Sequence, residues 1–285
     1  MTTTSLRNGP GAVAVPGGEL AYEIRGGRTE PVLAIHGISS QRKLWNWLRA
    51  AAPEITLIAP DLRGRADSFG VGGPSSVAQH AEDMISLFDS LGIESAHVCG
   101  MSMGGFVAME LGTRFPERVK SLILVDGGFP MAAPAGLTRE MLPTLFADRL
   151  ARLEQRWDSV DDYLTFFVEN TAPMLDRGDP LLRDNLAHDL RDGKVRLSGA
   201  ALLSDAANIT FDGIEWESVD VPIRFLHAQW SVGPDTPPAY SAELVDLYRD
   251  KTVLTQYLEG VDHAGSIMTA KGASATAGLL RAALA

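Results

Sequence analysis

Six short, mainly apolar runs recur along this chain, and none shows a long alternation of apolar and polar residues. They cover residues 32–35, 55–59, 96–99, 122–125, 223–226 and 253–257. A strand with one face in water shows a period of two, whereas a strand of a parallel sheet is buried on both faces and is continuously apolar. An opening hairpin over residues 11–15 and 19–24 and an amphipathic helix ended by Gly92 accompany these runs. The sequence therefore predicts a doubly wound α/β fold with a mostly parallel, eight-stranded sheet.

Ser102 lies where one of these runs meets a stretch typical of a helix, in Gly100-Met101-Ser102-Met103-Gly104. A sharp turn from strand into helix leaves a serine hydroxyl exposed above the sheet edge. Glycines two positions away leave room for the strained backbone and the packed helix. A chain with 28 glycines can also produce this pattern by accident, as an ordinary tight turn. Other motifs are needed to distinguish a nucleophile from a turn.

Two further motifs flank this serine in the chain. Residues 31–35 are followed by His36-Gly37-Ile38, a loop that can direct a backbone N–H at the serine. The last apolar run is followed by Gly260-Val261-Asp262-His263, a turn that presents a histidine. With these motifs in this order, the sequence resembles the α/β-hydrolase superfamily from about Gly11 to the C-terminus.

The resemblance implies roles for individual residues. Ser102 would be the nucleophile and His263 the general base, and the backbone N–H groups of Ile38 and Met103 would form the oxyanion hole. We expect His36 to shape the oxyanion loop by hydrogen bonding and not to act as a base. The segment from Pro60 to Ser68 also resembles the superfamily. Within it, Arg65 stands where a histidine is often found, and the sequence assigns that arginine no function.

The acid of the triad is the least regular part of the pattern. The superfamily usually carries an aspartate shortly after its seventh strand, but Ser231 occupies that place here. A serine can orient an imidazole but cannot hold the negative charge that stabilises an imidazolium. Some members take their acid from the end of the sixth strand, where this chain has Asp126. We therefore favour Asp126 as the acid, with Asp235 as the alternative if its loop bulges toward the histidine.

From about Gly128 to Val219 the sheet pattern stops and helical spacing takes over. Leu142 to Leu153 forms one apolar stripe, and a second helix is expected to start at Ser159, with Asp162 three residues on. This predicts a core domain of residues 1–128 and 219–285 and an inserted helical cap, or lid, of residues 129–218. Packing of the cap onto the core would explain most of its aromatic residues. Candidate substrate contacts are Ser39, Met141, Leu145, Phe166, Phe167 and Met174.

A short stretch beginning at Trp230 further resembles the zearalenone-type lactone hydrolases, in which a similar tryptophan lines the pocket. Trp230 would then stack against a flat, apolar substrate, although a loop tryptophan that merely plugs the cap is an equal alternative. The chain departs from that subgroup at Asp126, where the subgroup has glutamate, in the methionines beside Ser102, and in its His-Gly oxyanion loop. These departures leave the identity of the substrate open.

Three functions are consistent with these motifs. The leading hypothesis is a serine hydrolase of carboxylic esters with an acyl-enzyme mechanism, acting as an esterase or lactonase on a bulky hydrophobic substrate such as a zearalenone-like macrolactone. A carbon–carbon bond hydrolase of the meta-cleavage-product type uses the same triad and would want a cap arginine for the substrate carboxylate. A small-molecule receptor that retains the triad is the third. The cap arginines are Arg139, Arg149, Arg152 and Arg156.

The composition of the chain restricts the classes of molecule that it can bind. A formal charge of −11 without a run of Lys or Arg argues against nucleic acid and anionic membranes. No apolar stretch approaches the roughly 18 residues that cross a bilayer, and no signal peptide is evident, so we expect a cytoplasmic protein. The expected partner is a small-molecule ester or lactone, and an exposed cap face could support a homodimer. The single cysteine, Cys99, cannot form an internal disulfide.

No metal or organic cofactor is predicted. The remaining histidines show no paired ligand spacing, and no glycine-rich phosphate loop follows an opening strand. These histidines are His80, His97, His188 and His227.

Overall fold

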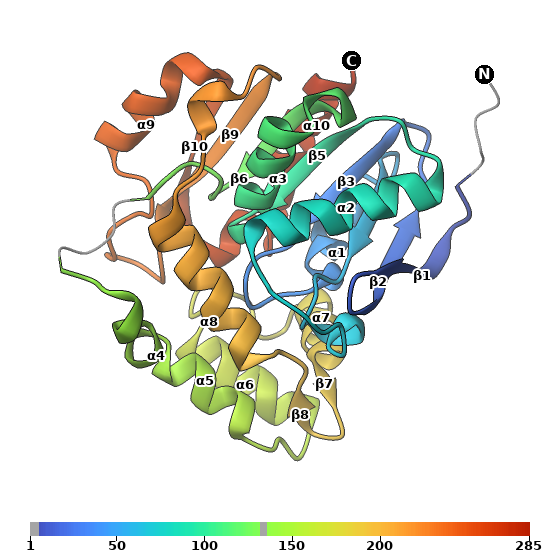
Figure 1. Ribbon diagram of the computed structural model, residues 1–285. Coiled ribbons are helices and arrows are strands. Elements are labelled where there is room, and N and C mark those ends of the chain that lie inside the picture. Colours follow the sequence, from blue (N-terminus) through green and yellow to red (C-terminus); the bar gives the residue numbers. More distant parts are fainter. Residues whose placement is uncertain (1–5, 132–135) are drawn as a thin grey trace.

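A single twisted sheet of eight strands forms the centre of the protein. The structure is a computed structural model that describes residues 6–131 and 136–285. The strand order is β1-β2-β4-β3-β5-β6-β9-β10, antiparallel from β1 to β4 and parallel from β4 to β10 (Figure 1). The strands are β1 (Gly9–Val15), β2 (Gly18–Arg25), β3 (Pro31–Ile35), β4 (Thr56–Pro60), β5 (Ala96–Met101), β6 (Val119–Val125), β9 (Ile223–Trp230) and β10 (Thr252–Asp262). The predicted fold class, with an eight-stranded and mostly parallel sheet, is confirmed.

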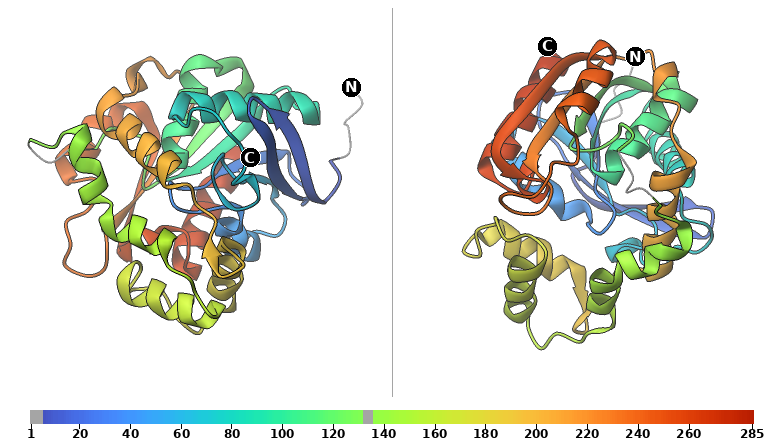
Figure 2. Two further views of the ribbon diagram at one scale, coloured as in Figure 1. Left: turned by 60° about the horizontal axis from the view of Figure 1, so that its bottom comes forward. Right: turned by 90° about the vertical axis from the view of Figure 1, so that its left-hand side faces the viewer.

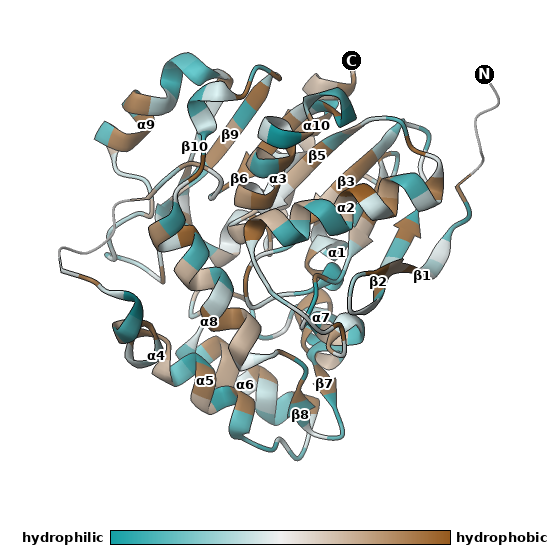
Figure 3. Ribbon diagram, in the orientation of Figure 1, coloured by the Kyte–Doolittle hydropathy of each residue, from teal (hydrophilic) through white to brown (hydrophobic). Residues whose placement is uncertain are grey.

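Helices pack their apolar sides on both faces of this sheet, which explains why the central strands are mainly apolar. Leu33 and Ile35 of β3 point into one layer with α2 (Val77–Leu91) and α3 (Met103–Arg114). Val32 and Ala34 point into the other layer, with α1 (Asn46–Ala51) and α10 (Ala270–Leu284). Figure 3 shows these strands as mainly hydrophobic and the outer sides of α2 and α3 as more hydrophilic. Successive side chains of a strand point to opposite faces, so one run supplies both layers.

The expected crossover helix is confirmed as α2, and its two ends have identifiable causes. The Ser76 side chain accepts a hydrogen bond from the Gln79 N–H at the first turn. Gly92 ends the helix in the left-handed conformation, with φ of 67°, which glycine adopts without strain. This helix brings the chain from β4 at one side of the sheet to β5 at its centre.

Between β6 and β9 the chain forms a helical segment that we call the insertion (residues 129–218). Figures 1 and 2 show it across one end of the strands. This is the carboxyl end, because Gln41, in the loop after β3, donates to the Asn185 carbonyl at 2.9 Å and Trp47 donates to Asp179 at 2.7 Å. Its elements are α4 (Leu142–Leu145), α5 (Ala147–Glu154), α6 (Val160–Asn170), α7 (Pro180–Asp189), α8 (Gly199–Ala207) and the strand pair β7 (Leu190–Arg191) and β8 (Lys194–Val195).

The structure of the insertion confirms only part of what the sequence predicted for it. The Ser159 side chain caps α6 by accepting from the Asp162 N–H, as predicted. The apolar stripe from Leu142 to Leu153 is not one helix, because Phe146 leaves helical geometry and divides it. The expected all-helical cap also contains a hairpin, which turns at Asp192-Gly193 with φ of 52° and 73°. Residues 1–5 of the expected core and 132–135 of the expected cap lie outside the described residues.

The last strand differs from the buried strand that the sequence suggested. β10 lies at the edge of the sheet, and Val253, Leu254 and Tyr257 are exposed there. An edge strand has a neighbour on one side only, so apolar residues in it are not necessarily buried.

The described part of the chain contains no helix long and apolar enough to cross a membrane. Short 3-10 helices complete the fold. The 3-10 helices are Arg42–Trp45, Ala66–Ser68, Pro116–Arg118, Arg139–Met141, Trp216–Ser218, Arg249–Lys251 and Ala264–Ser266, and Asn208–Asp212 is a π-helical turn.

Candidate active site

Ser102 occupies the sharp turn between β5 and α3 and is partly exposed. Its backbone has φ of 55° and ψ of −121°, a conformation that non-glycine residues rarely adopt. The Ser102 N–H donates to the Val125 carbonyl at 2.9 Å, so the turn is held by the neighbouring strand β6. The strain is therefore stored at the residue that the sequence identified as the candidate nucleophile.

The glycines around Ser102 are required by close backbone approach. A Cβ added at Gly104 would collide with the carbonyl oxygen of Ile35, and one at Gly100 would collide with the backbone of Gly104. The start of α3 thus packs directly on the ends of β3 and β5. This agrees with the expectation that larger side chains two residues from the serine would block the turn.

Asp126 and His263 meet beside this turn. The Asp126 Oδ2 and His263 Nδ1 atoms are 2.6 Å apart, and Asp126 Oδ1 accepts the Ala228 N–H at 3.0 Å. Asp126 is buried, whereas the His263 side chain is 32% exposed. With Nδ1 directed at the carboxylate, Nε2 is left for the open side of the ring.

The structure places Ser102 next to this pair without a hydrogen bond from its hydroxyl to His263. The two are close because the residue after Asp126, Gly127, packs on the Ser102 backbone, where an added Cβ would collide with it. Among the described residues, however, the Ser102 Oγ has no hydrogen-bond partner within the protein. Serine and histidine often come into hydrogen-bond contact only when a substrate is bound. The geometry therefore keeps Ser102 as the candidate that His263 would activate.

The alternative acid lies elsewhere. Asp235 is exposed in the loop after β9, at φ of 64°, and no hydrogen bond of its carboxylate to the described residues is present. Ser231 begins the same loop and donates its N–H to the Pro237 carbonyl at 3.2 Å. Asp126 is thus the carboxylate that contacts His263.

Asp262 is a buried residue beside the site that the sequence analysis did not single out. Its two oxygens accept the Gly233 N–H at 3.1 Å and the Gly265 N–H at 2.8 Å. It therefore joins the loop after β9 to the turn that carries His263. Its position directly before the histidine was the available signal.

The loop after β3 lies against the serine turn. A Cβ added at Gly37, the residue before Ile38, would be 3.2 Å from the Cβ of Ser102. The Ile38 N–H has no protein acceptor within residues 6–131 and 136–285, and Met103 is the first residue of α3, where an N–H has no partner in a preceding turn. Both N–H groups predicted for the oxyanion hole are therefore available to a ligand.

His36 is buried within this loop as a neutral hydrogen-bonding group. Its Nε2 accepts the Leu62 N–H at 2.9 Å, so Nδ1 carries the proton and donates to the Gly37 carbonyl at 2.8 Å. Complete burial disfavours the charged imidazolium and lowers the pKa of His36 to about 4. The hydrogen bond to Gly37 and the charge of nearby Asp61 raise this pKa, but burial has the larger effect. These contacts agree with a role in shaping the loop and not with a role as a base.

The low pKa of His36 predicts a pH-dependent stability. An unfolded histidine titrates near 6.5, so unfolding takes up a proton between about pH 4 and 6.5, and the free energy of unfolding should fall by up to about 3 kcal/mol as the pH drops through that window. Urea unfolding of the wild type and of His36→Asn at about pH 7 and about pH 5 measures this contribution. The wild type should lose more stability than the variant. Equal losses would contradict a buried, neutral His36.

This comparison is needed because another buried group acts in the opposite direction. Burial raises the pKa of Asp189 to about 6, so the stability contributed by its protonated form is lost as the pH rises through the same window. Both proteins retain Asp189, and its effect cancels in the difference between them.

The predicted substrate contacts fall into distinct environments. Trp230 is not in a loop, as the plug alternative assumed, but is the last residue of β9, partly buried and paired with Asp262. Phe166 packs on Trp157 at 4.9 Å between ring centroids, and Phe167 packs on Tyr163 at 6.2 Å, as expected of residues that hold the insertion together.

The other candidates are more open. Met141 and Leu145 are 50% and 55% exposed, and Ser39 and Met174 are partly exposed. The turn that contains Met174 approaches the loop after β9, because a Cβ added at Gly233 would lie 3.0 Å from Pro173. Substrate contact by these residues stays a prediction.

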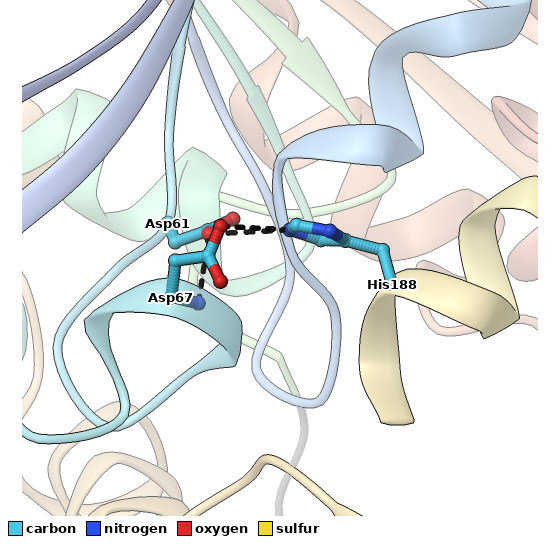
Figure 4. Close-up of side chains that lie close together, drawn as sticks. All are labelled: Asp61, Asp67 and His188. Atoms are coloured by element: carbon cyan, nitrogen blue, oxygen red, sulfur yellow. Dashed lines mark hydrogen bonds and ion pairs between the residues drawn. The ribbon is translucent and has the colours of Figure 1, made fainter. Parts of the chain in front are cut away.

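Asp61, Asp67 and His188 come together although they are distant in sequence (Figure 4). Their ligand-type atoms lie within 4.8 Å of one another, an arrangement that sequence spacing could not reveal. The Arg42 guanidinium, however, donates to Asp61 and, at 2.6 Å, to Asp67, while His188 lies 3.5 Å from Asp61. A metal ion would have to displace this guanidinium. We interpret the group as an ion-pair network that joins α7 to the loop after β4.

Residues 32–275 match the model of the alpha/beta hydrolase family. The chain is 38% identical over 110 residues to the putative carbamate hydrolase RutD of Azorhizobium caulinodans, which is 38% of this chain and 41% of that protein. In the first two curated relatives the match spans only 41% and 44% of the protein's own length.

Solved structures share the fold over nearly the whole chain. E-2-(acetamidomethylene)succinate hydrolase has a TM-score of 0.74 at 19% identity, covering 96% of this chain and 98% of that one. The enol-lactonase of Burkholderia xenovorans LB400 has a TM-score of 0.67 at 20% identity, covering 96% and 99%. The strained serine turn, the sheet order and the family match over residues 32–275 together establish that the chain belongs to the alpha/beta hydrolase family.

Proposed function

We propose that this hydrolase cleaves carboxylic esters through an acyl-enzyme, with Ser102 as nucleophile, His263 as base and Asp126 as acid. The observation that carries the proposal is the 2.6 Å contact between His263 Nδ1 and the buried Asp126 carboxylate, beside the strained turn of Ser102. A hydroxyl is a poor nucleophile at neutral pH unless an adjacent base removes its proton.

The chemistry proceeds in two stages. As Ser102 Oγ attacks the carbonyl carbon, its proton passes to His263 Nε2, and the imidazolium is stabilised by Asp126 on its other side. The negative oxygen of the tetrahedral intermediate is bound by the N–H groups of Ile38 and Met103. His263 then gives its proton to the leaving alcohol, and a water molecule, activated by the same histidine, releases the acid.

We further propose a bulky, apolar ester or lactone as the substrate. The partly buried Trp230 supports this, as do Met141 and Leu145, which are exposed on the insertion. A relative described as a carbamate hydrolase and a structural neighbour described as an enol-lactonase are in keeping with acyl transfer, the latter through its fold only. In a lactone the alcohol stays tethered to the acyl-enzyme, so water must enter before the ring recloses.

A second candidate function is favoured by Arg152 of α5. Its side chain is buried between Tyr163 and Phe167, with the guanidinium carbon 5.9 Å from each ring centroid. Within the described part of the chain, its Nε and Nη2 have no hydrogen-bond partner. Arg152 stabilises the charged form of the nearby buried Asp189, but no hydrogen bond joins the two side chains. A buried guanidinium gains from a hydrogen-bonded carboxylate, so a substrate that bears a carboxylate would suit Arg152. This supports the carbon–carbon bond hydrolase alternative.

One substrate panel tests both candidates. Wild-type protein is incubated with zearalenone, with short p-nitrophenyl esters and with a yellow dienol acid of the meta-cleavage type. We expect repeated opening of the macrolactone, alongside slower release of p-nitrophenol. If only the short esters react, the proposed esterase activity stands, but the macrolactone is not a substrate. Bleaching of the dienol would favour the second candidate. Stoichiometric binding without turnover of any compound would reject both and favour a receptor.

A further inference from the structure

Arg65 is buried directly behind the loop proposed to form the oxyanion hole. It is 1% exposed, and its Nε and Nη2 both donate to the carbonyl of Ile38, at 3.1 and 3.0 Å. Its Nη1 donates to the Arg63 carbonyl at 2.8 Å. A planar guanidinium with two N–H groups on one carbonyl fixes that carbonyl in direction as well as in distance.

The other partner of Arg65 comes from the insertion. Asp205 of α8 is fully buried and lies 2.7 Å from Arg65 Nη2. The Asp205 carboxylate also accepts from Ser75 Oγ at 2.8 Å and lies 3.1 Å from His80 Nε2. Burial would raise the pKa of Asp205, but His80, Arg65 and Ser75 outweigh it and lower the pKa to about 2. The Asp205 carboxylate is therefore charged near neutral pH.

Two successive peptide groups of the oxyanion loop are thus held by buried side chains. The Gly37 carbonyl belongs to the same peptide unit as the Ile38 N–H, and His36 Nδ1 donates to it. The next carbonyl, that of Ile38, is held by Arg65. Fixing the peptides on both sides of the Ile38 Cα leaves its N–H little freedom to turn. Preorganised donors are effective because they need no reorientation in the transition state.

We propose that Arg65 is a positioning residue that aims the Ile38 N–H at the oxyanion, and that Asp205 ties this arginine, and with it the oxyanion hole, to α8 of the insertion. This inference rests on the proposed esterase chemistry. It explains why this chain has Arg65 where related proteins often have histidine. A neutral histidine could not form both the ion pair with Asp205 and the two hydrogen bonds to the Ile38 carbonyl. The insertion reaches Arg65 a second time through a β-bridge between Arg65 and Leu197.

The chain offers a matched control in Arg63. Its guanidinium is also buried, and it pairs with the buried Asp83 through two hydrogen bonds of 2.8 and 2.7 Å. Its remaining side-chain contacts are to the carbonyls of Gly72, Pro74 and Pro16, none of which belongs to the oxyanion loop. Arg63→Lys therefore reproduces the cost of altering a buried arginine without touching Ile38.

The experiment compares Arg65→Lys with Arg63→Lys on a p-nitrophenyl ester that the wild type hydrolyses. A lysine can reach either Ile38 or Asp205 but cannot form both contacts in the geometry of the guanidinium. Arg65→Lys should lower kcat about 10- to 100-fold with KM within about threefold, because loss of an oxyanion donor costs about 100-fold or more. Arg63→Lys should keep kcat within about threefold. Affinity for a trifluoromethyl ketone should fall in parallel with kcat, and affinity for the product acid should not.

Each other outcome has a definite meaning. If Arg65→Lys and Arg63→Lys lower kcat equally, or if neither does, the positioning role is wrong. If Arg65→Lys does not fold, Asp205→Asn replaces it, since the amide keeps the shape and removes the charge, and an unchanged kcat there overturns the proposal. A retained kcat in Asp205→Asn beside a lowered one in Arg65→Lys overturns the link to α8. A wild type that hydrolyses no ester rejects the proposed function itself, and this inference with it.

Discussion

Ser102→Ala should abolish ester hydrolysis, with kcat lower by about 10⁶-fold. Ser102 is partly exposed at the strained turn that follows β5. The hydroxyls of Ser266 and Tyr240 also lie near His263 and Asp126, but both are buried and donate to backbone carbonyls. Without the hydroxyl, His263 has no proton to take and no acyl-enzyme can form. Steady-state rates on a p-nitrophenyl ester, together with labelling by a fluorophosphonate, measure the effect. The variant should be neither active nor labelled.

A second substitution at this position separates chemistry from strain. Ser102→Gly removes the same hydroxyl and also accepts the positive φ of 55° without cost. It should be as inactive as Ser102→Ala, while its free energy of unfolding rises by about 1 kcal/mol above that of the alanine variant. Activity retained in either folded variant would contradict the assignment of Ser102 as the nucleophile. Equal stability of the two variants would contradict stored strain but not the assignment.

The fold could be predicted from the sequence because its determinants are local. Each buried strand contains a short, mainly apolar run, and α2 carries its start signal at Ser76 and its stop signal at Gly92. The serine turn is likewise predicted by a motif of five consecutive residues. The hairpin of the insertion also has a local signal, since Asp192-Gly193 is the pair that tight hairpin turns prefer, but the helical spacing on which the predicted cap rests does not reveal it.

Other features could not be predicted, because they depend on contacts between distant segments. Arg65 meets Asp205, and Asp61 meets His188, only after the insertion has folded onto the carboxyl end of the sheet. No spacing in the chain encodes these pairs. The exposure of Val253 depends on strand order, since an edge strand and a central strand can have the same composition. The acid was an intermediate case, in which the sequence left two aspartates and the geometry distinguishes them.

Asp126→Asn should lower kcat about 10⁴-fold while leaving the fold intact. The amide oxygen can still accept the Ala228 N–H, and asparagine tolerates the positive φ of 46° at this residue. Its amide group, however, would present N–H to His263 Nδ1 where the carboxylate oxygen now accepts. The imidazole would then keep its proton on Nε2 and could not take one from Ser102. Rates on the ester, with urea unfolding as a check on stability, measure the outcome.

The matched control is Asp235→Asn, which changes the same chemical group at the alternative position. Asp235 is exposed and makes no contact with His263, so this variant should keep kcat within about threefold of the wild type. The opposite pattern, an inactive Asp235→Asn and an active Asp126→Asn, would mean that the loop after β9 moves inward when substrate binds. Loss of activity in both would point to a carboxylate pair that shares the task. Only a loss confined to Asp126→Asn agrees with an acid supplied by the end of β6, since the hydrogen bond seen there would then be the one that catalysis uses.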